Sequence, residues 1–459
     1  MTHDASRRAF LKRSTMLAMA GTAAPWALNL AAMAEAAAAT ATDYKALVCE
    51  FLYGGNDYGN TLMPYDDARY ALYQGMRPTL AYTQAQLKPT VLVPSVALAG
   101  GLQYAIAPEL APLLPLFNQG RMGVMLNVGT LVQPTTKAQY TAGNVPLPPR
   151  LFSHNDQQSV WQSSSPEGAS SGWGGRMGDL FESGNGNAVF TCVNVSGNAV
   201  YLSGKQATQY QVSPSGPVPL NGVSKPLFGS TACSAALQNL VTAPSANLLE
   251  NEYARVSARS LSAGGTLSAA LAAGPTINTP FPTPGTNGLA DQLKLVARMI
   301  STADAVGAKR QVFFVSMGGF DTHDGLATIH PGLLTSVADA LSAFYAATVE
   351  LGVASQVTTF TASDFGRTLT ANDGSDHGWG SMHFMLGGAV KGGRYYGTPP
   401  VVANGGPDDV GQGRLLPSTS VDQYAATMGS WLGISDTDLL TVLPNLANWN
   451  ASQRNVGFV

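Results

Sequence analysis

Aspartate and histidine side chains occur at short intervals in four glycine-containing segments of this 459-residue sequence. The segments carry Asp57, the pair Asp321 and His323, Asp364, and His377. Carboxylates and imidazoles are the ordinary protein ligands of hard or borderline divalent cations. Together the four segments therefore predict a metal site, with Zn²⁺ or Mn²⁺ as the cofactor.

Each of these segments also has a plainer interpretation. Asp and Gly are common turn residues, and Asp often caps a following helix. The similar placement of all four segments favours the metal site. His383 is a reserve ligand, although a histidine packed within a strand is the simpler interpretation at that position.

The elements before these segments explain why the segments should meet. Apolar runs at 46–53, 311–316 and 357–362 predict buried strands, and each run leads into one of the segments. In an open parallel sheet, ligands bind outside the carboxyl ends of the strands. We therefore expect the five predicted ligands to converge on one pocket at that edge.

The fold class follows from the alternation of helices and strands in the C-terminal part of the chain. Apolar residues recur at helical spacing over 289–300 and 334–344, between the predicted strands. Earlier strands are predicted at 122–128 and 188–195. The pattern predicts a three-layer α/β/α sandwich with a mostly parallel sheet.

Residues 203–287 differ in composition from the rest, being rich in Ser, Pro, Gly, Asn, Ala and Thr. Such stretches usually lie on the surface. We expect one domain over 40–459, in which 203–287 is a cap or peripheral insertion.

Composition excludes several classes of function. The formal net charge is −3, charged residues make up 12% of the chain, and no basic stripe is present, so a nucleic-acid partner is not expected. The G-x-S-x-G, G-x-x-x-x-G-K-[ST] and H-E-x-x-H motifs are absent. Cys49 lies in an apolar run and is expected to be buried, while Cys192 and Cys233 could pair or stay free.

The first 39 residues have the features of an export signal. Arg7-Arg8 precedes Phe10-Leu11-Lys12, and a modest apolar stretch and small residues follow. This pattern predicts a twin-arginine signal peptide, with the twin-arginine machinery as a partner. No later stretch was expected to span a bilayer. The mature protein is therefore predicted to be soluble and periplasmic or secreted.

An ordered set of motifs resembles a known bacterial family. The motifs are the Arg-Arg-x-Phe-Leu start, Gly54-Gly55-Asn56-Asp57-Tyr58-Gly59-Asn60, Ser153-His154 with Trp161 following, Gly319-Phe320-Asp321-Thr322-His323, Ser363-Asp364-Phe365-Gly366-Arg367-Thr368 and Asp376-His377-Gly378-Trp379-Gly380. They resemble the family called domain of unknown function 1501. That family is distantly similar to the alkaline phosphatase and sulfatase superfamily, which implies an alkaline-phosphatase-like fold.

The resemblance also implies roles for particular residues. Asp57, Asp321, His323, Asp364 and His377 stand where the superfamily holds its metals, although Phe365 replaces a histidine ligand. One metal held by Asp321, His323 and His377 agrees better with this sequence than two. Ser153 corresponds to the nucleophile or, alternatively, His154 acts as a base.

Two functions remain open at this stage. The first is metal-assisted hydrolysis of phosphate or sulfate esters outside the cytoplasm, on a small anionic ester or a glycan-type substrate. Arg367 would hold the anionic group, or else form an ordinary ion pair. The second is a non-catalytic envelope binding or assembly protein that retains a degenerate alkaline-phosphatase-like fold.

Overall fold

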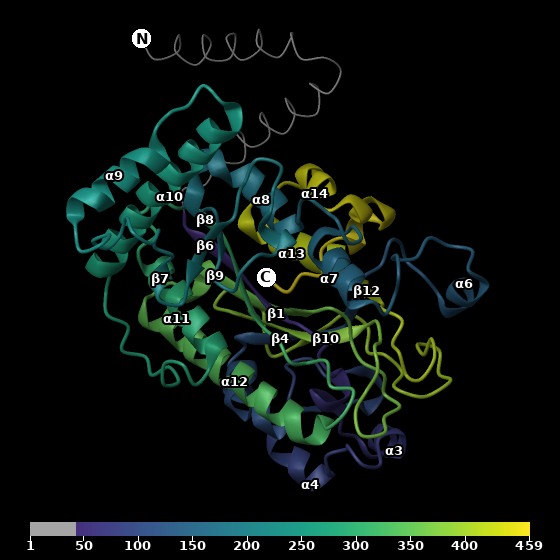
Figure 1. The fold of residues 1–459 in the computed structure, drawn as a ribbon. Coiled ribbons are helices and arrows are strands. Elements are labelled where there is room, and N and C mark those ends of the chain that lie inside the picture. The colour runs from purple at the N-terminus through teal and green to yellow at the C-terminus, as the bar shows by residue number, and fades with distance from the viewer. Residues whose placement is uncertain (1–42) are drawn as a thin grey trace.

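The computed structural model describes residues 43–459 and shows a central sheet with helices on both faces (Figure 1). The predicted signal peptide lies outside the described residues. In spatial order the main sheet contains β11 (Tyr395–Tyr396), β4 (Met122–Gly129), β10 (Ser381–Gly387), β9 (Val357–Ser363), β1 (Lys45–Leu52), β8 (Arg310–Met317), β5 (Cys192–Asn194), β6 (Tyr210–Ser213) and β7 (Gly216–Pro217), with β12 (Thr419–Ser420) beside β4. A separate small sheet pairs β2 (Leu62–Pro64) with β3 (Tyr104–Ile106).

Strand directions confirm the predicted mostly parallel sheet. β1 pairs in parallel with both β8 and β9, and β5 and β6 continue the parallel set. β10 runs antiparallel to β9 and β4. The sheet is therefore mixed at one side and parallel around β1, where the predicted ligands follow the strands.

Alternate side chains of β1 enter two different cores. Val48 and Leu52 pack with one core cluster, and Cys49 and Phe51 pack with the other. A strand that is apolar on both faces is typical of a covered parallel sheet, which is why its sequence reads as one continuous apolar run.

Helices cover both faces of the sheet and complete the three layers. The first core cluster receives residues from α3 (Asp67–Met76), α4 (Gln84–Leu87), α5 (Leu114–Asn118), α11 (Gly288–Ser301) and α12 (Leu326–Glu350). The second receives residues from α7 (His154–Ser163), α8 (Trp173–Phe181), α13 (Val421–Leu432) and α14 (Asp436–Val442). A short helix, α6 (Lys137–Ala142), lies away from both layers.

One predicted strand is shorter in the structure than expected. The run at 188–195 begins as a 3-10 turn over Ala188–Phe190, so its strand is only Cys192–Asn194. A 3-10 helix over Pro108–Leu113 precedes α5, because prolines supply no amide hydrogen for a regular α-helix.

The segment 203–287 contains β6, β7 and two helices, α9 (Thr231–Thr242) and α10 (Leu248–Ala273). α9 and α10 lie at one end of the molecule (Figure 1). Ala263, Leu267 and Ala270 on the C-terminal half of α10 join the first core cluster. The segment is thus attached to the sheet at its base, and its description as a cap within one domain stays a prediction.

α12 is the one helix among residues 43–459 that is long and apolar enough to cross a membrane by length and composition. This finding corrects the expectation from the sequence that no stretch after the signal is long and apolar enough to span a bilayer. Leu334, Val337 and Leu341 on α12 are buried in the first core. Burial of this face accounts for part of the apolar composition of the helix, since 44% of its most apolar window is buried.

The cysteines are all free thiols. Cys49 and Cys192 are buried, as expected for Cys49, and Cys233 is exposed on α9. Cys192 is buried and Cys233 is exposed, and the two do not form a disulfide in the structure.

Candidate metal centre

The carboxyl ends of neighbouring strands place two predicted ligands side by side. In the parallel pairing of β1 with β8 and β9, Leu52 lies opposite both Met317 and Ser363. Asp364 directly follows β9, and Asp321 follows the end of β8 by four residues. These two carboxylates therefore lie at the sheet edge where ligands were expected.

Gly54 allows the chain after β1 to pass close to the loop that carries Asp321. Its φ is 114°, and a Cβ atom at this position would lie 2.3 Å from the backbone nitrogen of Asp321. Only glycine accepts that approach and that φ. The Gly54 backbone N–H also donates to Oδ1 of Asp364 at 3.2 Å, so the turn helps to orient this carboxylate.

His154 is the first residue of α7, and Asp364 fixes its orientation. The Nδ1 atom of His154 lies 2.6 Å from Oδ2 of Asp364, and Gln158 donates to the same oxygen at 2.7 Å. A carboxylate only accepts hydrogen bonds, so Nδ1 of His154 carries the proton. The Nε2 atom of His154 is buried and has no hydrogen-bond partner.

His377 is oriented in the same way by a backbone carbonyl. Its Nδ1 atom donates to the carbonyl oxygen of Phe152 at 2.6 Å, which leaves Nε2 without that proton. Phe152 itself has a φ of 74°, which is uncommon for a bulky residue. The strained turn before α7 thus supplies the carbonyl that orients His377.

Three histidines point their Nε2 atoms at one carboxylate oxygen. Oδ1 of Asp321 lies 3.3 Å from Nε2 of His154, 3.0 Å from Nε2 of His323 and 3.4 Å from Nε2 of His377. Ligand atoms around a tetrahedral ion with bonds of about 2.0–2.1 Å lie about 3.3–3.4 Å apart. The spacing of these atoms therefore matches one coordination sphere.

The proton positions make this arrangement unfavourable without a cation. The Nε2 atoms of His154 and His377 are acceptors, and they face a carboxylate oxygen that is also an acceptor. A cation, or a proton on one histidine, removes the repulsion. The donor set of imidazole nitrogens with one carboxylate suits Zn²⁺ and Mn²⁺.

Neighbouring charges shift the pKa values in this cluster. The hydrogen bond to Asp364 raises the pKa of His154 above its usual value, against the effect of burial. Burial lowers the pKa of His377. Burial alone would raise the pKa of Asp321, but the hydrogen bond and charge of Arg367 outweigh it and keep the carboxylate ionised.

A second group of donors adjoins the first and is more exposed. Nε2 of His323 lies 2.9 Å from Nε2 of His377, and Nδ1 of His323 lies 3.9 Å from Oδ1 of Asp376. His323, Asp376 and His377 could also hold a cation. His377 belongs to both groups, and its Nδ1 already donates to the Phe152 carbonyl. Only Nε2 of His377 is left as a ligand, so the two sites are not independent.

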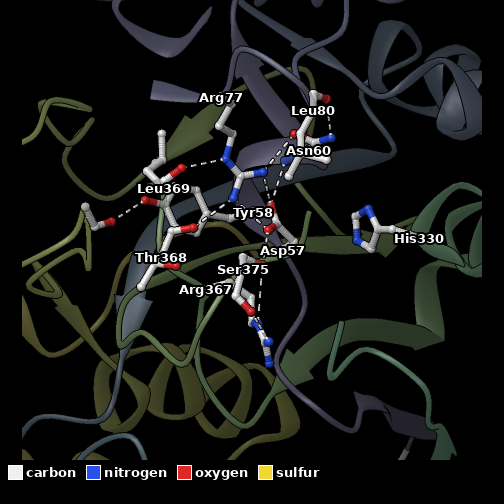
Figure 2. A network of polar contacts seen from close by, with 12 residues as sticks. Asp57, Tyr58, Asn60, Arg77, Leu80, His330, Arg367, Thr368, Leu369 and Ser375 are labelled. Atoms are coloured by element: carbon white, nitrogen blue, oxygen red, sulfur yellow. Dashed lines mark hydrogen bonds and ion pairs between the residues drawn. The ribbon is translucent and has the colours of Figure 1, made fainter. Parts of the chain in front are cut away.

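The structure does not bring Asp57 into this cluster, which corrects the predicted convergence of five ligands. Figure 2 shows its carboxylate enclosed by donors from the chain itself. Arg77 donates to both oxygens, at 2.8 and 2.7 Å, Asn60 donates its backbone N–H, and Ser375 donates its hydroxyl at 2.6 Å. Asp57 and Arg77 are fully buried. Asp57 is thus a structural ion-pair partner with no free lone pair for a metal.

Two predicted catalytic residues also have other partners. The Ser153 hydroxyl donates to Asp156 at 3.0 Å, whereas His154 reaches the centre, with Nε2 3.3 Å from Oδ1 of Asp321. Arg367 is fully buried and donates to Asp321 at 2.6 Å and to the Gly54 carbonyl at 2.9 Å, with its remaining nitrogens on Ser375. Arg367 therefore forms an ion pair that holds Asp321 in place, which is the second of its two predicted roles, and its guanidinium is not free for a substrate anion.

Aromatic packing encloses the histidines from one side. The ring of Phe365 lies 4.9 Å from that of His154 and 4.8 Å from that of His377, so it forms a wall at the site. His383 is buried in β10, where Nδ1 lies 3.1 Å from the Thr361 hydroxyl and the ring packs on Trp161. His383 therefore belongs to the core, in agreement with its simpler interpretation as a histidine packed within a strand.

Sequence reasoning missed the groups that orient the histidines. Gln158 lies four residues after His154, on the same face of α7, and this spacing was a signal that could have been used. The Phe152 carbonyl and the Arg77 partner of Asp57 had no comparable signal. Both depend on how distant segments meet.

The chain matches one family model and is loosely similar to several solved structures. A family model described as "Protein of unknown function (DUF1501)" matches residues 44–445. No curated protein sequence matches the chain. The structure of Ps i-CgsB with k-i-k-neocarrahexaose is 10% identical, with 89% of this chain and 77% of that chain covered and a TM-score of 0.35.

Two further similar structures are enzymes by name. The PsFucS1 sulfatase from Pseudoalteromonas sp. is 9% identical, with coverages of 89% and 72% and a TM-score of 0.33. The alkaline phosphatase from the Antarctic bacterium TAB5 is 9% identical, with coverages of 75% and 91% and a TM-score of 0.28. These similarities are too weak to carry over an activity, so the function has to be judged from the site itself.

Proposed function

The chain belongs to the DUF1501 family, and we propose that it is a metal-dependent hydrolase of phosphate or sulfate esters whose metal is held by His154, His377 and Asp321. One observation carries the proposal. The buried Nε2 atom of His154 has no partner, although Asp364 holds it toward an acceptor oxygen of Asp321.

The residues present fit a divalent cation. A histidine that ligates a metal usually donates its other ring N–H to a carboxylate or carbonyl, which fixes the ring and raises its basicity. His154 does so to Asp364, and His377 does so to Phe152. His323 lies beside both and is 46% exposed, so it is a further ligand or a donor at the open side.

When bound, a divalent cation supplies Lewis-acid polarisation of an ester oxygen and activation of water. The chain's own residues prepare that chemistry. Asp364 keeps the His154 proton on Nδ1, Arg367 holds Asp321 ionised, and Phe365 shields one side of the cluster from water. The exposed His323, next to Asp376, is placed to exchange a proton with solvent.

The nucleophile in this proposal is water and not a side chain. The Ser153 hydroxyl is engaged by Asp156, and the sequence lacks a nucleophile elbow. The substrate class is a small phosphate or sulfate ester, including esters on glycans. We also propose export by the twin-arginine route, which rests on Arg7 and Arg8 and places the activity in the periplasm or outside the cell.

The test combines metal analysis with an ester screen on the purified chain. We expect one equivalent of Zn²⁺ or Mn²⁺ and hydrolysis of p-nitrophenyl phosphate or sulfate. His154→Ala and Asp321→Asn should lose the metal and the activity. Asp324→Asn, an exposed carboxylate three residues from Asp321, is the matched control and should keep both.

Three results separate the possible conclusions. Loss of metal in Asp321→Asn but not in Asp324→Asn supports the centre. Metal bound equally by both variants refutes the assigned ligands. Stoichiometric metal in the wild-type protein without hydrolysis of any ester refutes the hydrolase and favours the non-catalytic envelope protein.

A further inference from the structure

Exposed large apolar side chains are concentrated in one part of the described chain. Of fourteen such residues, eight lie between positions 218 and 256. The most exposed are in and beside the α9–α10 hairpin: Phe228 at 91%, Leu248 at 86%, Leu249 at 84% and Leu240 at 75%. Exposed apolar side chains that lie together on a folded protein are typical of an interaction surface.

The N-terminal half of α10 carries an apolar stripe without a partner. Leu249, Tyr253 and Val256 are spaced by four and three residues, which places them on one face of the helix. They are 84%, 61% and 44% exposed, while Ala254, on another face, is buried. Spacing of four and three is that of a helix–helix seam.

Beyond Val256 the stripe enters a groove. The groove has a volume of about 690 Å³ and lies between α10 and the segment around Val218 and Leu220. Its walls on α10 include Val256, Ser260 and Gly264. The helix thus presents protruding apolar side chains at its start and, about two turns later, a recess that Arg259 lines together with apolar side chains such as Val256.

The charged side chains beside the stripe change sign along the helix. Glu252 and Arg259 are seven residues apart and therefore flank the stripe on the same side. Arg255 pairs with Glu252 at 3.1 Å, and the side chains of this pair are 73% and 60% exposed. The flank is thus acidic at Glu252 and basic at Arg255 and Arg259, and reversing it brings Glu252 opposite Arg259.

We propose that the N-terminal half of α10 is a self-association surface, on which a second copy of this chain docks with its α10 antiparallel about a two-fold axis. A two-fold interface places the same patch of both copies face to face. With the axis between Arg255 and Val256, Glu252 of each copy lies opposite Arg259 of the other copy, so the interface contains this pair two times. Leu249 of each copy then lies opposite the groove of the other.

This geometry selects a second copy over other occupants. A lipid surface would satisfy the leucines but would gain nothing from the alternating charges or from the recess. A different protein would need its own protruding apolar residues, charges and groove in the reverse of the order found on α10, and a second copy of α10 already has them. The proposal does not depend on the hydrolase activity, since α10 contributes no residue to the metal centre.

The test is sedimentation equilibrium of the purified chain from about 1 to about 100 µM, the range of weak, specific association. We expect a dimer for the wild type and a monomer for Leu249→Glu. Leu72→Glu, on the half-exposed Leu72 of α3, is the matched control and should remain dimeric. Circular dichroism verifies that each variant is folded.

Charge reversal tests the antiparallel register. Glu252→Arg and Arg259→Glu should each weaken the dimer about tenfold, because each change places two like-charge pairs in the interface. The double variant should recover most of that loss. A monomeric wild type, a dimer that ignores Leu249→Glu, or a double variant no better than the singles overturns the proposal. Monomers that bind phosphatidylcholine vesicles through Leu249 also overturn it, in favour of a lipid surface.

Discussion

Glu50 is a fully buried carboxylate at the centre of the sheet, and neither of its oxygens has a hydrogen-bond partner. It lies on β1 between Val315 of β8 and Thr361 of β9. Burial raises the pKa of Glu50 from 4.5 to about 8. The folded protein therefore carries this side chain as a neutral acid at pH values where the unfolded chain carries it ionised.

The sign of the effect on stability follows from proton binding. Between pH 4.5 and about 8 the folded state binds one more proton at Glu50 than the unfolded state, so stability falls as the pH rises through that window. Each pH unit costs about 1.4 kcal/mol, which gives an upper limit of about 4–5 kcal/mol across the window. Glu50→Gln removes the titration, so this loss disappears in the variant.

The assay is urea unfolding at intervals from pH 5 to pH 9. Gln leaves a buried amide, which lowers stability by about 1–3 kcal/mol at every pH, so the slope and not the absolute value is compared. Glu167→Gln, at an exposed carboxylate, is the matched control and should keep the wild-type slope. Equal slopes for the wild type and Glu50→Gln would refute the buried neutral carboxyl.

Three further predictions concern the centre, its surroundings and export. Asp364→Asn should weaken metal binding about 10–100-fold in equilibrium dialysis. The Asp364 hydrogen bond raises the pKa of His154, so the metal affinity of the wild type should fall as the pH drops through that raised pKa. In the variant this fall in affinity should occur at lower pH. Asp57→Ala should destabilise the protein by about 3–5 kcal/mol in urea unfolding, because it leaves buried Arg77 unpaired, and the metal content per folded molecule should not change; loss of the metal alone would return Asp57 to the ligand set. Replacing Arg7 and Arg8 by Lys should leave precursor in the cytoplasm of fractionated cells, and normal export of that variant would contradict the twin-arginine assignment.

The sequence predicted the parts of the site that follow local patterns. The continuous apolar run of β1 reflects burial on both faces of the sheet, and the turns after β8 and β9 carry Asp321 and Asp364 to the same edge. Because parallel strands share that edge, residues far apart in sequence could be placed together from strand patterns alone.

The roles of individual side chains could not be predicted in the same way. Asp57 has the same local context as the other candidates, yet Arg77 approaches it from α3 and closes it off. The turn before α7 was predicted to supply Ser153 as a nucleophile or His154 as a base, and the orientation of His154 depends on Asp364, 210 residues away. Such pairings are tertiary contacts, and nothing in the composition of the separate segments encodes them.

The charges around the centre connect the metal to the class of substrate. Among residues 43–459, two guanidinium groups pair with the carboxylates of the centre: Arg367 with Asp321 and Arg414 with Asp376, while Asp364 has no arginine partner. With neutral histidines the site has one excess negative charge, and a divalent cation changes that to one excess positive charge. Fields of one sign in a site attract counter-ions of the other. Without a cation these charges would therefore attract a metal and repel an anionic ester, and with a cation they would do the opposite. Under the proposed function, affinity for phosphate or sulfate would therefore depend on the metal, without a free arginine to hold the anion.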